Sequence, residues 1–161
     1  MNDSVDPAAT DSQWRRGRRL GIDIGKVRIG VAACDPDGIL ASPVATVSRD
    51  LKTKSDNVPQ DLRELAAIID EYEAVEVIVG LPVTLSGEEG LAASHTREWV
   101  SRLTEVIDPV PVRLIDERLT TAVATRRLAE RGVRGKRRRA VVDQAAAVEI
   151  LQQWLELHRK A

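Results

Sequence analysis

The chain reads RLGIDIG at residues 19–25 and RIGVAAC at residues 28–34. In the first segment Leu20 and Ile22 point one way and Asp23 the other, which is the pattern of a β-strand with one face on a core. The second segment also reads as a strand, and the connection between the two is short and contains glycine. The sequence therefore predicts a hairpin, and with it an antiparallel start to a sheet.

The rest of the chain alternates between helix and strand patterns. Strands are expected near residues 39–47, 75–79 and 111–115, and helices over 58–69, from a Ser86–Glu89 capping box to 106, over 120–131 and over 139–157. The order βββαβαβαα predicts the α/β class, with a mixed sheet flanked by helices. The length of 161 residues suits one domain, expected over residues 18–161 behind a disordered tail of residues 1–17.

Composition narrows the possible function classes. The formal net charge is −1, so attraction to nucleic acid must come from local clusters rather than from a global basic field. The chain has a single cysteine, Cys34, which excludes an intrachain disulfide and fits a reducing compartment. No apolar run is long enough to span a membrane, and the N-terminus lacks a secretory region. The expected location is the cytoplasm, without membrane contact.

Three carboxylates stand where an ionised side chain needs a special partner. Asp23 lies inside the first strand, and Glu117 directly follows a later one. Asp143 falls on the apolar face of the last helix, which is formed by Ala146, Ala147, Ile150 and Trp154. Burying such a charge costs several kcal/mol unless it is paired or bound to a metal. Carboxylates that converge from two strands and a helix would form an oxygen-rich site suited to Mg²⁺, or to Mn²⁺ as a substitute.

Each acid also has an ordinary explanation. Asp23 could accept hydrogen bonds from nearby backbone, and Glu117 could pair with Arg113 or Arg118. Asp143 could cap the first turn of its helix, where an acid interacts favourably with the helix dipole. These alternatives stay open at this point, because the pattern alone does not show whether the three acids converge.

Four blocks of the sequence together resemble the RuvX/YqgF family. In the family's order they are LGIDIG with RIGVA at residues 20–32, VGLP at 79–82, DERLTT at 116–121 and DQAAA at 143–147. The resemblance covers residues 18–157 and implies a ribonuclease H-like fold, with a mixed five-stranded sheet flanked by helices. By motif, Asp23, Glu117 and Asp143 match the family's acidic positions, with Asp116 as a less favoured substitute for Glu117.

The resemblance implies a metal-dependent nuclease that matures the 5′ end of precursor 16S rRNA during ribosome biogenesis. The alternatives are a Holliday-junction resolvase acting on four-way DNA, and a weakly active nucleic-acid-binding assembly factor. The hypothesis for the reaction is that the three acids hold one or two Mg²⁺ ions, which activate a water for in-line attack on phosphorus. Sugar kinases and actin-like ATPases open on a similar hairpin, but they need a second such domain.

Basic side chains supply the expected contacts with nucleic acid. They are Arg28, Arg118, Arg134, Lys136, Arg137, Arg138 and Arg139. Residues 134–139 are expected to form a basic loop that follows phosphates near the acids, and the alternative is a solvated loop without function. The expected partners are precursor rRNA or branched DNA, together with ribosomal particles. The oligomeric state is left as monomer or homodimer, because junction resolution would require two sites.

Overall fold

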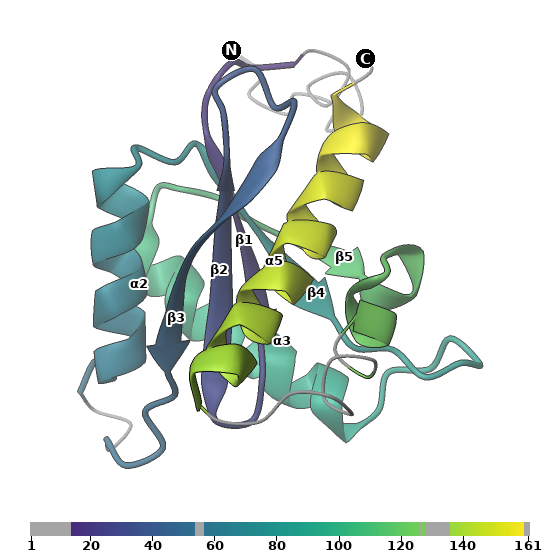
Figure 1. The fold of residues 1–161 in the computed structure, drawn as a ribbon. Helices are drawn as coiled ribbons and strands as arrows, with labels where there is room; N and C mark the ends of the chain where they lie inside the picture. The colour runs from purple at the N-terminus through teal and green to yellow at the C-terminus, as the bar shows by residue number, and fades with distance from the viewer. Residues whose placement is uncertain (1–13, 54–56, 126, 128–135, 160–161) are drawn as a thin grey trace, which may run out of the picture.

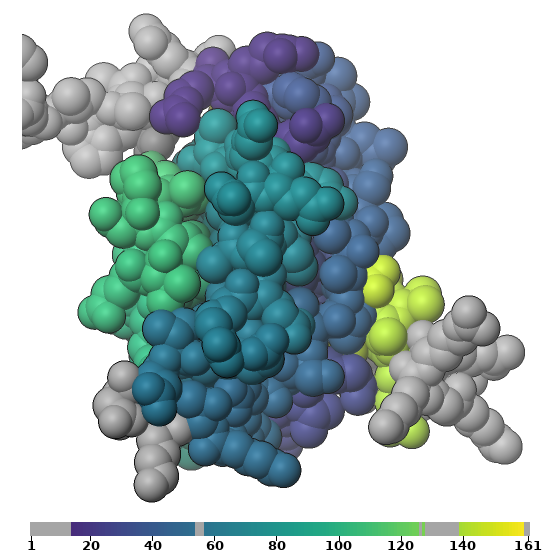
Figure 2. Space-filling model, turned by 90° about the vertical axis from the view of Figure 1, so that its left-hand side faces the viewer, coloured from purple at the N-terminus to yellow at the C-terminus, as the bar shows by residue number. Residues whose placement is uncertain are grey.

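The computed structural model describes residues 14–53, 57–125, 127 and 136–159. Its strands are β1 (Arg19–Ile24), β2 (Arg28–Cys34), β3 (Ala41–Ser48), β4 (Glu76–Leu81) and β5 (Val112–Asp116). Its helices include α2 (Gln60–Glu71), α3 (Leu91–Ile107), the short 3₁₀ helix η1 (Glu117–Leu119) and α5 (Lys136–His158), and residues 122–125 are also helical. In Figure 1, α5 crosses one face of the sheet in the foreground. Figure 2 shows the outer surface of α2, with β3 beside it.

The strands form one mixed sheet in the order β3-β2-β1-β4-β5. β1 pairs antiparallel with β2, and β2 with β3, whereas β4 runs parallel to β1 and β5 runs parallel to β4. The predicted hairpin start, the α/β class and the mixed five-stranded sheet flanked by helices are confirmed. Because β1, β4 and β5 are parallel, their carboxyl ends lie at one edge of the sheet, where ligand crevices commonly form.

Alternation along β1 separates the two faces of the sheet. Leu20 and Ile22 are fully buried in a core that the sheet shares with α2 and α3. Gly21 and Asp23 point to the opposite face, which α5 covers. A Cβ atom on Gly21 would lie 2.6 Å from the Cβ of Leu151 on α5. The helix therefore rests directly on the strand backbone, and this close approach requires glycine.

Residues 14–17, which the pattern assigns to the tail, contact the folded body. The ring centroid of Trp14 lies 6.5 Å from that of Trp154 on α5. The backbone N–H of Gly17 donates a hydrogen bond to the carbonyl of Pro36 at 2.9 Å. The folded part therefore begins earlier than predicted. The ring of Trp14 makes an apolar contact with α5, and the largely polar composition of the segment gave no sign of this contact. The rest of the predicted tail lies outside the described residues.

The start of α3 differs from the prediction. The helix begins at Leu91 behind Gly90, and no side chain caps it, so the predicted Ser86–Glu89 capping box does not form. Glu89 instead makes an ion pair with Arg97, with an Nη2–Oε2 distance of 2.8 Å. That pair occupies the carboxylate on which the capping box depends.

The start of α5 also differs, because the helix begins at Lys136 rather than near Arg139. Part of the predicted basic loop is therefore the first turn of a helix. Arginine and lysine favour helices, and this propensity outweighs the unfavourable placement of cations at a helix N-terminus. Like the other helices in the described ranges, α5 does not combine the length and apolarity needed to cross a lipid bilayer.

Candidate active site

Asp23 is a buried carboxylate near the end of β1, on the face that α5 covers. It is 1% exposed. Its cross-strand neighbour on β2 is Gly30. A Cβ atom on Gly30 would lie 1.9 Å from the main-chain oxygen of Asp143 on α5. The missing side chain at position 30 therefore lets α5 bring Asp143 against the strand pair that carries Asp23.

Glu117 is the first residue of η1, directly after β5, and it is 7% exposed. Its side chain lies over Gly80 of β4, because a Cβ atom there would be 3.1 Å from both the Cγ and the Oε1 of Glu117. Gly80 follows Val79, which is in register with Ile22 of β1. Gly80 is thus beside Asp23 in the sheet, and its lack of a side chain leaves room for Glu117 on the same face.

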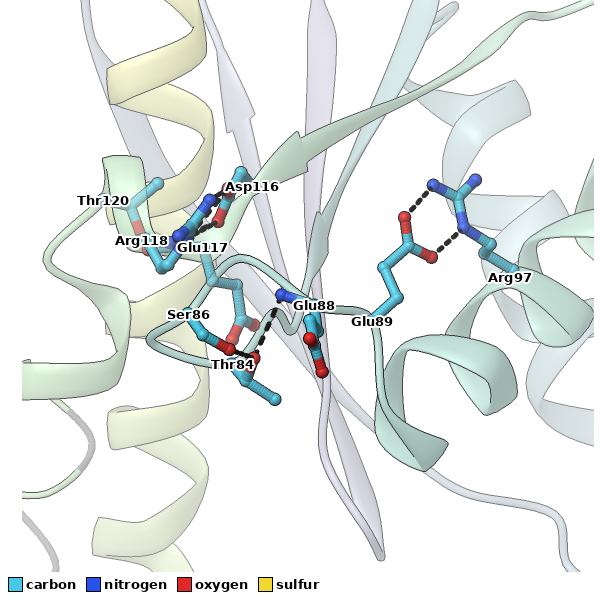
Figure 3. A network of polar contacts seen from close by, with 9 residues as sticks. All are labelled: Thr84, Ser86, Glu88, Glu89, Arg97, Asp116, Glu117, Arg118 and Thr120. Atoms are coloured by element: carbon cyan, nitrogen blue, oxygen red, sulfur yellow. Dashed lines mark hydrogen bonds and ion pairs between the residues drawn. The ribbon is translucent and has the colours of Figure 1, made fainter.

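The two arginines considered as partners of Glu117 have other partners. Arg118 forms an ion pair with Asp116, with an Nη2–Oδ2 distance of 2.6 Å. Arg113 pairs with Glu76, with an Nε–Oε2 distance of 3.1 Å. Figure 3 shows Arg118 turned back onto Asp116, while the side chain of Glu117 points away from this pair. Pairing with either arginine therefore does not explain the burial of Glu117.

Asp116 has a structural role at the same junction. Its carboxylate accepts a hydrogen bond from the backbone N–H of Arg118 at 2.9 Å and so caps η1. The hydrogen-bonded guanidinium of Arg118 holds the pKa of this carboxyl below its usual value. Asp116 thus shapes the turn that presents Glu117, which favours Glu117 as the functional acid.

Asp143 lies about two turns into α5, too far along the helix to cap its first turn. The apolar face that the pattern predicted around it is buried and consists of Ala146, Ala147, Ile150 and Trp154. The Oδ2 of Asp143 accepts a hydrogen bond from the Nε of Arg28 at 2.7 Å, and the two side chains are 15% and 27% exposed respectively. Arg28, a predicted contact to nucleic acid, is therefore the ion-pair partner of Asp143.

The three acids come from β1, η1 and α5, and they face one part of the sheet above Gly30 and Gly80. Among the residues that the structure describes, no three His, Cys, Asp or Glu side chains are grouped closely enough to hold a metal ion. The predicted metal site therefore stays a prediction. Its donor set, which consists of carboxylate oxygens, fits a hard divalent cation.

The structure describes only some of the side chains that are predicted to contact nucleic acid. Arg139 is exposed at the start of α5. The side chain of Arg118 is 41% exposed even though it pairs with Asp116. Arg134 lies outside the described residues, and only the backbone of residues 136–138 is described.

A pocket of about 310 Å³ beside Glu117 contains basic residues to which the pattern assigned no role. They are Lys26 between β1 and β2, Arg49 just after β3, and His95 on α3. No local signal identifies them, because they come from three separate segments that only the tertiary fold brings together.

Among solved structures, T. thermophilus RuvC in complex with a Holliday junction substrate has a TM-score of 0.47 and 16% sequence identity, over 85% of this chain and 92% of that chain. The sequence profile of the RuvX family, described as Holliday junction resolvase, matches residues 17–157.

Two curated relatives come from Rhodococcus species, and each carries the name "Putative pre-16S rRNA nuclease". The protein of Rhodococcus erythropolis is 57% identical over 146 residues, which cover 91% of this chain and 81% of the relative. The protein of Rhodococcus opacus is 60% identical over 141 residues, which cover 88% and 78% respectively. The chain therefore belongs to the RuvX family, and the prediction of a nuclease, a hydrolase of phosphodiester bonds, is confirmed.

Proposed function

We propose that this chain cleaves precursor 16S rRNA during maturation of its 5′ end, with Asp23, Glu117 and Asp143 as the catalytic carboxylates. The observation that carries the proposal is the burial of acids on one face of the sheet. Asp23 and Glu117 are 1% and 7% exposed, and Glu117 lies over Gly80, which is beside Asp23 in the sheet. Burial of carboxylates costs stability even when they are hydrogen-bonded, so such a group points to function. The name of the relatives supports the substrate.

The three acids would hold a divalent cation, and Mg²⁺, with Mn²⁺ as a substitute, suits their oxygen ligands. When bound, the ion supplies Lewis-acid polarisation of the scissile phosphate. The chain itself sets the positions of the acids, because Asp143 is held by the contact of α5 with Gly30. Arg28 is placed to exchange its ion pair with Asp143 for one with a phosphate oxygen of the substrate.

A four-way DNA junction is the second candidate substrate, and the description of the family favours it. Resolution of a junction requires two active sites and hence a homodimer, whereas processing of an RNA end requires only one site. A weakly active assembly factor is the third candidate. For the first substrate, we propose that the enzyme meets its RNA on ribosomal particles in the cytoplasm.

A side-by-side cleavage assay separates the candidates. A precursor RNA carrying the 16S 5′ leader and a four-way DNA junction are incubated with one preparation of the protein and Mg²⁺. We expect cleavage of the RNA, and its loss when a chelator is added. Asp23→Asn and Asp143→Asn should each reduce the rate by more than the roughly 10–100-fold typical of residues that only support a metal site. Asp37→Asn is the matched control, because that carboxylate pairs with Arg16 at the surface.

The outcomes are distinct. Cleavage of the junction alone would favour the resolvase. Tight binding without cleavage of either substrate would favour the assembly factor. An Asp23→Asn variant that cuts as fast as the wild type would remove this acid from the mechanism.

A further inference from the structure

The pocket beside Glu117 lies at the sheet edge where the parallel strands end. The ends of β1 and β4 contribute Ile24 and Pro82, and α3 contributes Ala92 and Trp99. Its volume of about 310 Å³ is at the lower end of the range for pockets that bind small ligands. A single nucleotide fits this size class, whereas a duplex does not.

Arg49 is a cation held in place in the pocket wall. Its backbone N–H donates a hydrogen bond to the carbonyl of Val27 at 2.8 Å, and its Nη1 donates one to the carbonyl of Gly25 at 2.9 Å. Its Nε lies 3.9 Å from the Oδ2 of Asp61, whose side chain is 3% exposed while that of Arg49 is 22% exposed. A side chain held by a hydrogen bond and an ion pair has already lost rotamer freedom, so binding an anion costs less entropy.

The lining of the pocket contains two cationic side chains, Lys26 and Arg49. Lys26 is exposed at the turn between β1 and β2, and His95 lines the pocket from α3. Within the described lining, Glu117 is the one carboxylate beside these residues and Arg49. Guanidinium and ammonium groups bind phosphate oxygens through charge-assisted hydrogen bonds.

The remaining wall of the pocket is apolar. Ile24, Pro82 and Ala92 line it together with Trp99, which is 8% exposed. Bases and sugars pack on apolar and aromatic surfaces of this kind, while their phosphates need cations. Both requirements of a nucleotide are therefore met in one pocket.

We propose that this pocket binds one nucleotide of the substrate strand next to the cleaved bond. Its phosphate contacts Arg49 and Lys26, and its base or sugar contacts the apolar wall. Glu117 provides the link, because it lines the pocket and also lies over Gly80, beside Asp23. The inference rests on the proposed function, since the strand runs from the pocket to the three acids. Asp61 is then a positioning residue that acts through Arg49.

The competing explanation is that Arg49 only ties the β1–β2 hairpin to the end of β3. In that case Arg49→Gln lowers stability and leaves nucleotide binding unchanged. Nucleotide binding by Arg49→Gln therefore separates the two explanations, and this measurement does not depend on catalysis.

Binding is measured on the full chain in the presence of a chelator, by titrating adenosine 5′-monophosphate and following the tryptophan indole N–H signals by NMR. The signal of Trp99, assigned with Trp99→Phe, is expected to shift. The signals of Trp14 and Trp154 are expected to stay, because they pack together in the core on the α5 face of the sheet, whereas Trp99 belongs to the core on the opposite face.

Charge variants complete the test. Arg49→Gln and Lys26→Gln should each weaken nucleotide binding about tenfold, as expected for a charge-assisted phosphate contact. Arg113→Gln is the matched control, because it removes the same charge near the amino end of β5, where Arg113 pairs with Glu76. In the cleavage assay, Arg49→Gln should raise KM about tenfold and change kcat less than twofold. Lys26 is exposed, so its replacement tests the site even if Arg49→Gln does not fold.

Unchanged nucleotide affinity in both Arg49→Gln and Lys26→Gln would overturn the inference, and so would a shift confined to Trp154. If the protein cleaves the RNA but the Trp99 signal does not shift with nucleotide, the pocket is not a nucleotide site, and the proposed function still stands. Binding at Trp99 by a chain that cleaves neither substrate would support the pocket and overturn the proposed function.

Discussion

The ion pair between Arg28 and Asp143 occupies the carboxylate of one of the three proposed catalytic acids. The Nε and Oδ2 atoms are 2.7 Å apart, and the carboxylate is 15% exposed. A metal ion that approaches Asp143 meets a guanidinium already bound there, and charges at such a separation interact strongly when they are partly removed from water. A phosphate that approaches Arg28 offers this guanidinium another partner. Substrate binding is therefore expected to favour metal binding.

Replacing Arg28 with glutamine should tighten Mn²⁺ binding to the substrate-free protein several-fold. The variant removes a positive charge that lies 2.7 Å from a proposed metal ligand. Isothermal titration calorimetry measures the affinity. Arg16→Gln is the control, because its pair with Asp37 is exposed on the surface. Equal Mn²⁺ affinities of wild type and Arg28→Gln would argue against Asp143 as a ligand.

Among the described glycines, Gly30 has the least room for a side chain. In Gly30→Ala, the new Cβ would lie 1.9 Å from the main-chain oxygen of Asp143, and rotation of a side chain cannot relieve that contact. We expect a loss of about 2–3 kcal/mol in the free energy of unfolding, measured with urea, because α5 must shift. At Gly90 the nearest atom to a new Cβ is 4.0 Å away, so Gly90→Ala should lose about 1 kcal/mol or less, through poorer helix capping. Equal losses would contradict the close approach of α5.

Among the secondary-structure elements, the junction of β5 and η1 explains how a buried acid is presented. Asp116 ends the strand, caps η1 and binds the guanidinium of Arg118. Glu117, the next residue, then lies over Gly80 of the neighbouring strand. Two adjacent acids therefore have different roles, because one belongs to the turn and the other to the sheet face.

Replacing Asp116 with asparagine should remove about 0.5–1 kcal/mol of stability at pH 7 while keeping a side chain that can cap η1. The Arg118 guanidinium lowers the pKa of Asp116 from its ordinary value of 3.8. The ion pair thus stabilises the fold above that value, and this contribution is lost as the pH falls through the lowered pKa. Urea unfolding of both proteins at pH 7 and at about pH 2 measures this dependence. A stability difference of the same size at both values would exclude the charge as its cause.

The first turn of α5 is the element expected to follow the nucleic-acid backbone. Neutralising Arg137, Arg138 and Arg139 to glutamine should flatten the dependence of binding on salt. The slope of log K against log salt changes by about 0.7 for each contact to single-stranded phosphate that is lost. Fluorescence anisotropy over a salt series measures this slope. Replacement of Arg63, Arg97 and Arg102 on α2 and α3 removes the same charge elsewhere, and an equal effect of both triple variants would exclude a specific role for α5.

For the molecule as a whole, Arg19 joins the N-terminal segment to the sheet. Its side chain is 3% exposed and pairs with Glu76 of β4 at 2.9 Å. Its Nη1 donates hydrogen bonds to the carbonyls of Arg15 and Gly17 at 2.6 Å and 2.8 Å, and its Cζ lies 3.8 Å from the ring centroid of Trp14. Residues before β1 are therefore part of the structural unit.

A chain that begins at Arg18 should melt about 5 °C lower than a chain that begins at Trp14. It lacks the contacts of Trp14 and the carbonyls that Arg19 binds, together worth about 2 kcal/mol. Differential scanning calorimetry of both chains and of the full protein measures the shift. We expect the chain beginning at Trp14 to match the full protein. If the two shortened chains melt at the same temperature, residues 14–17 add no stability, and the predicted tail of residues 1–17 is correct.

Periodicity predicted much of this fold, because it depends only on a residue and its near neighbours. The alternation around Asp23 predicted β1 and its hairpin, and the spacing of apolar residues predicted the buried face of α5 on which Asp143 lies. An acid on such a face is unusual on the local pattern alone. The choice of Glu117 over Asp116 came from the family resemblance, since two adjacent acids after a strand have similar local patterns.

Tertiary structure alone determined which side chains meet. Arg28 and Asp143 are 115 residues apart in the chain and form an ion pair because α5 packs on β2 at Gly30. Arg49 and Glu117 line one pocket because β3 runs in the same direction as β1, β4 and β5, so that all four strands end at the same edge of the sheet. Such contacts depend on strand order and on the closest distance that two backbones can reach. Local sequence patterns specify neither, because both result from packing the whole chain at once.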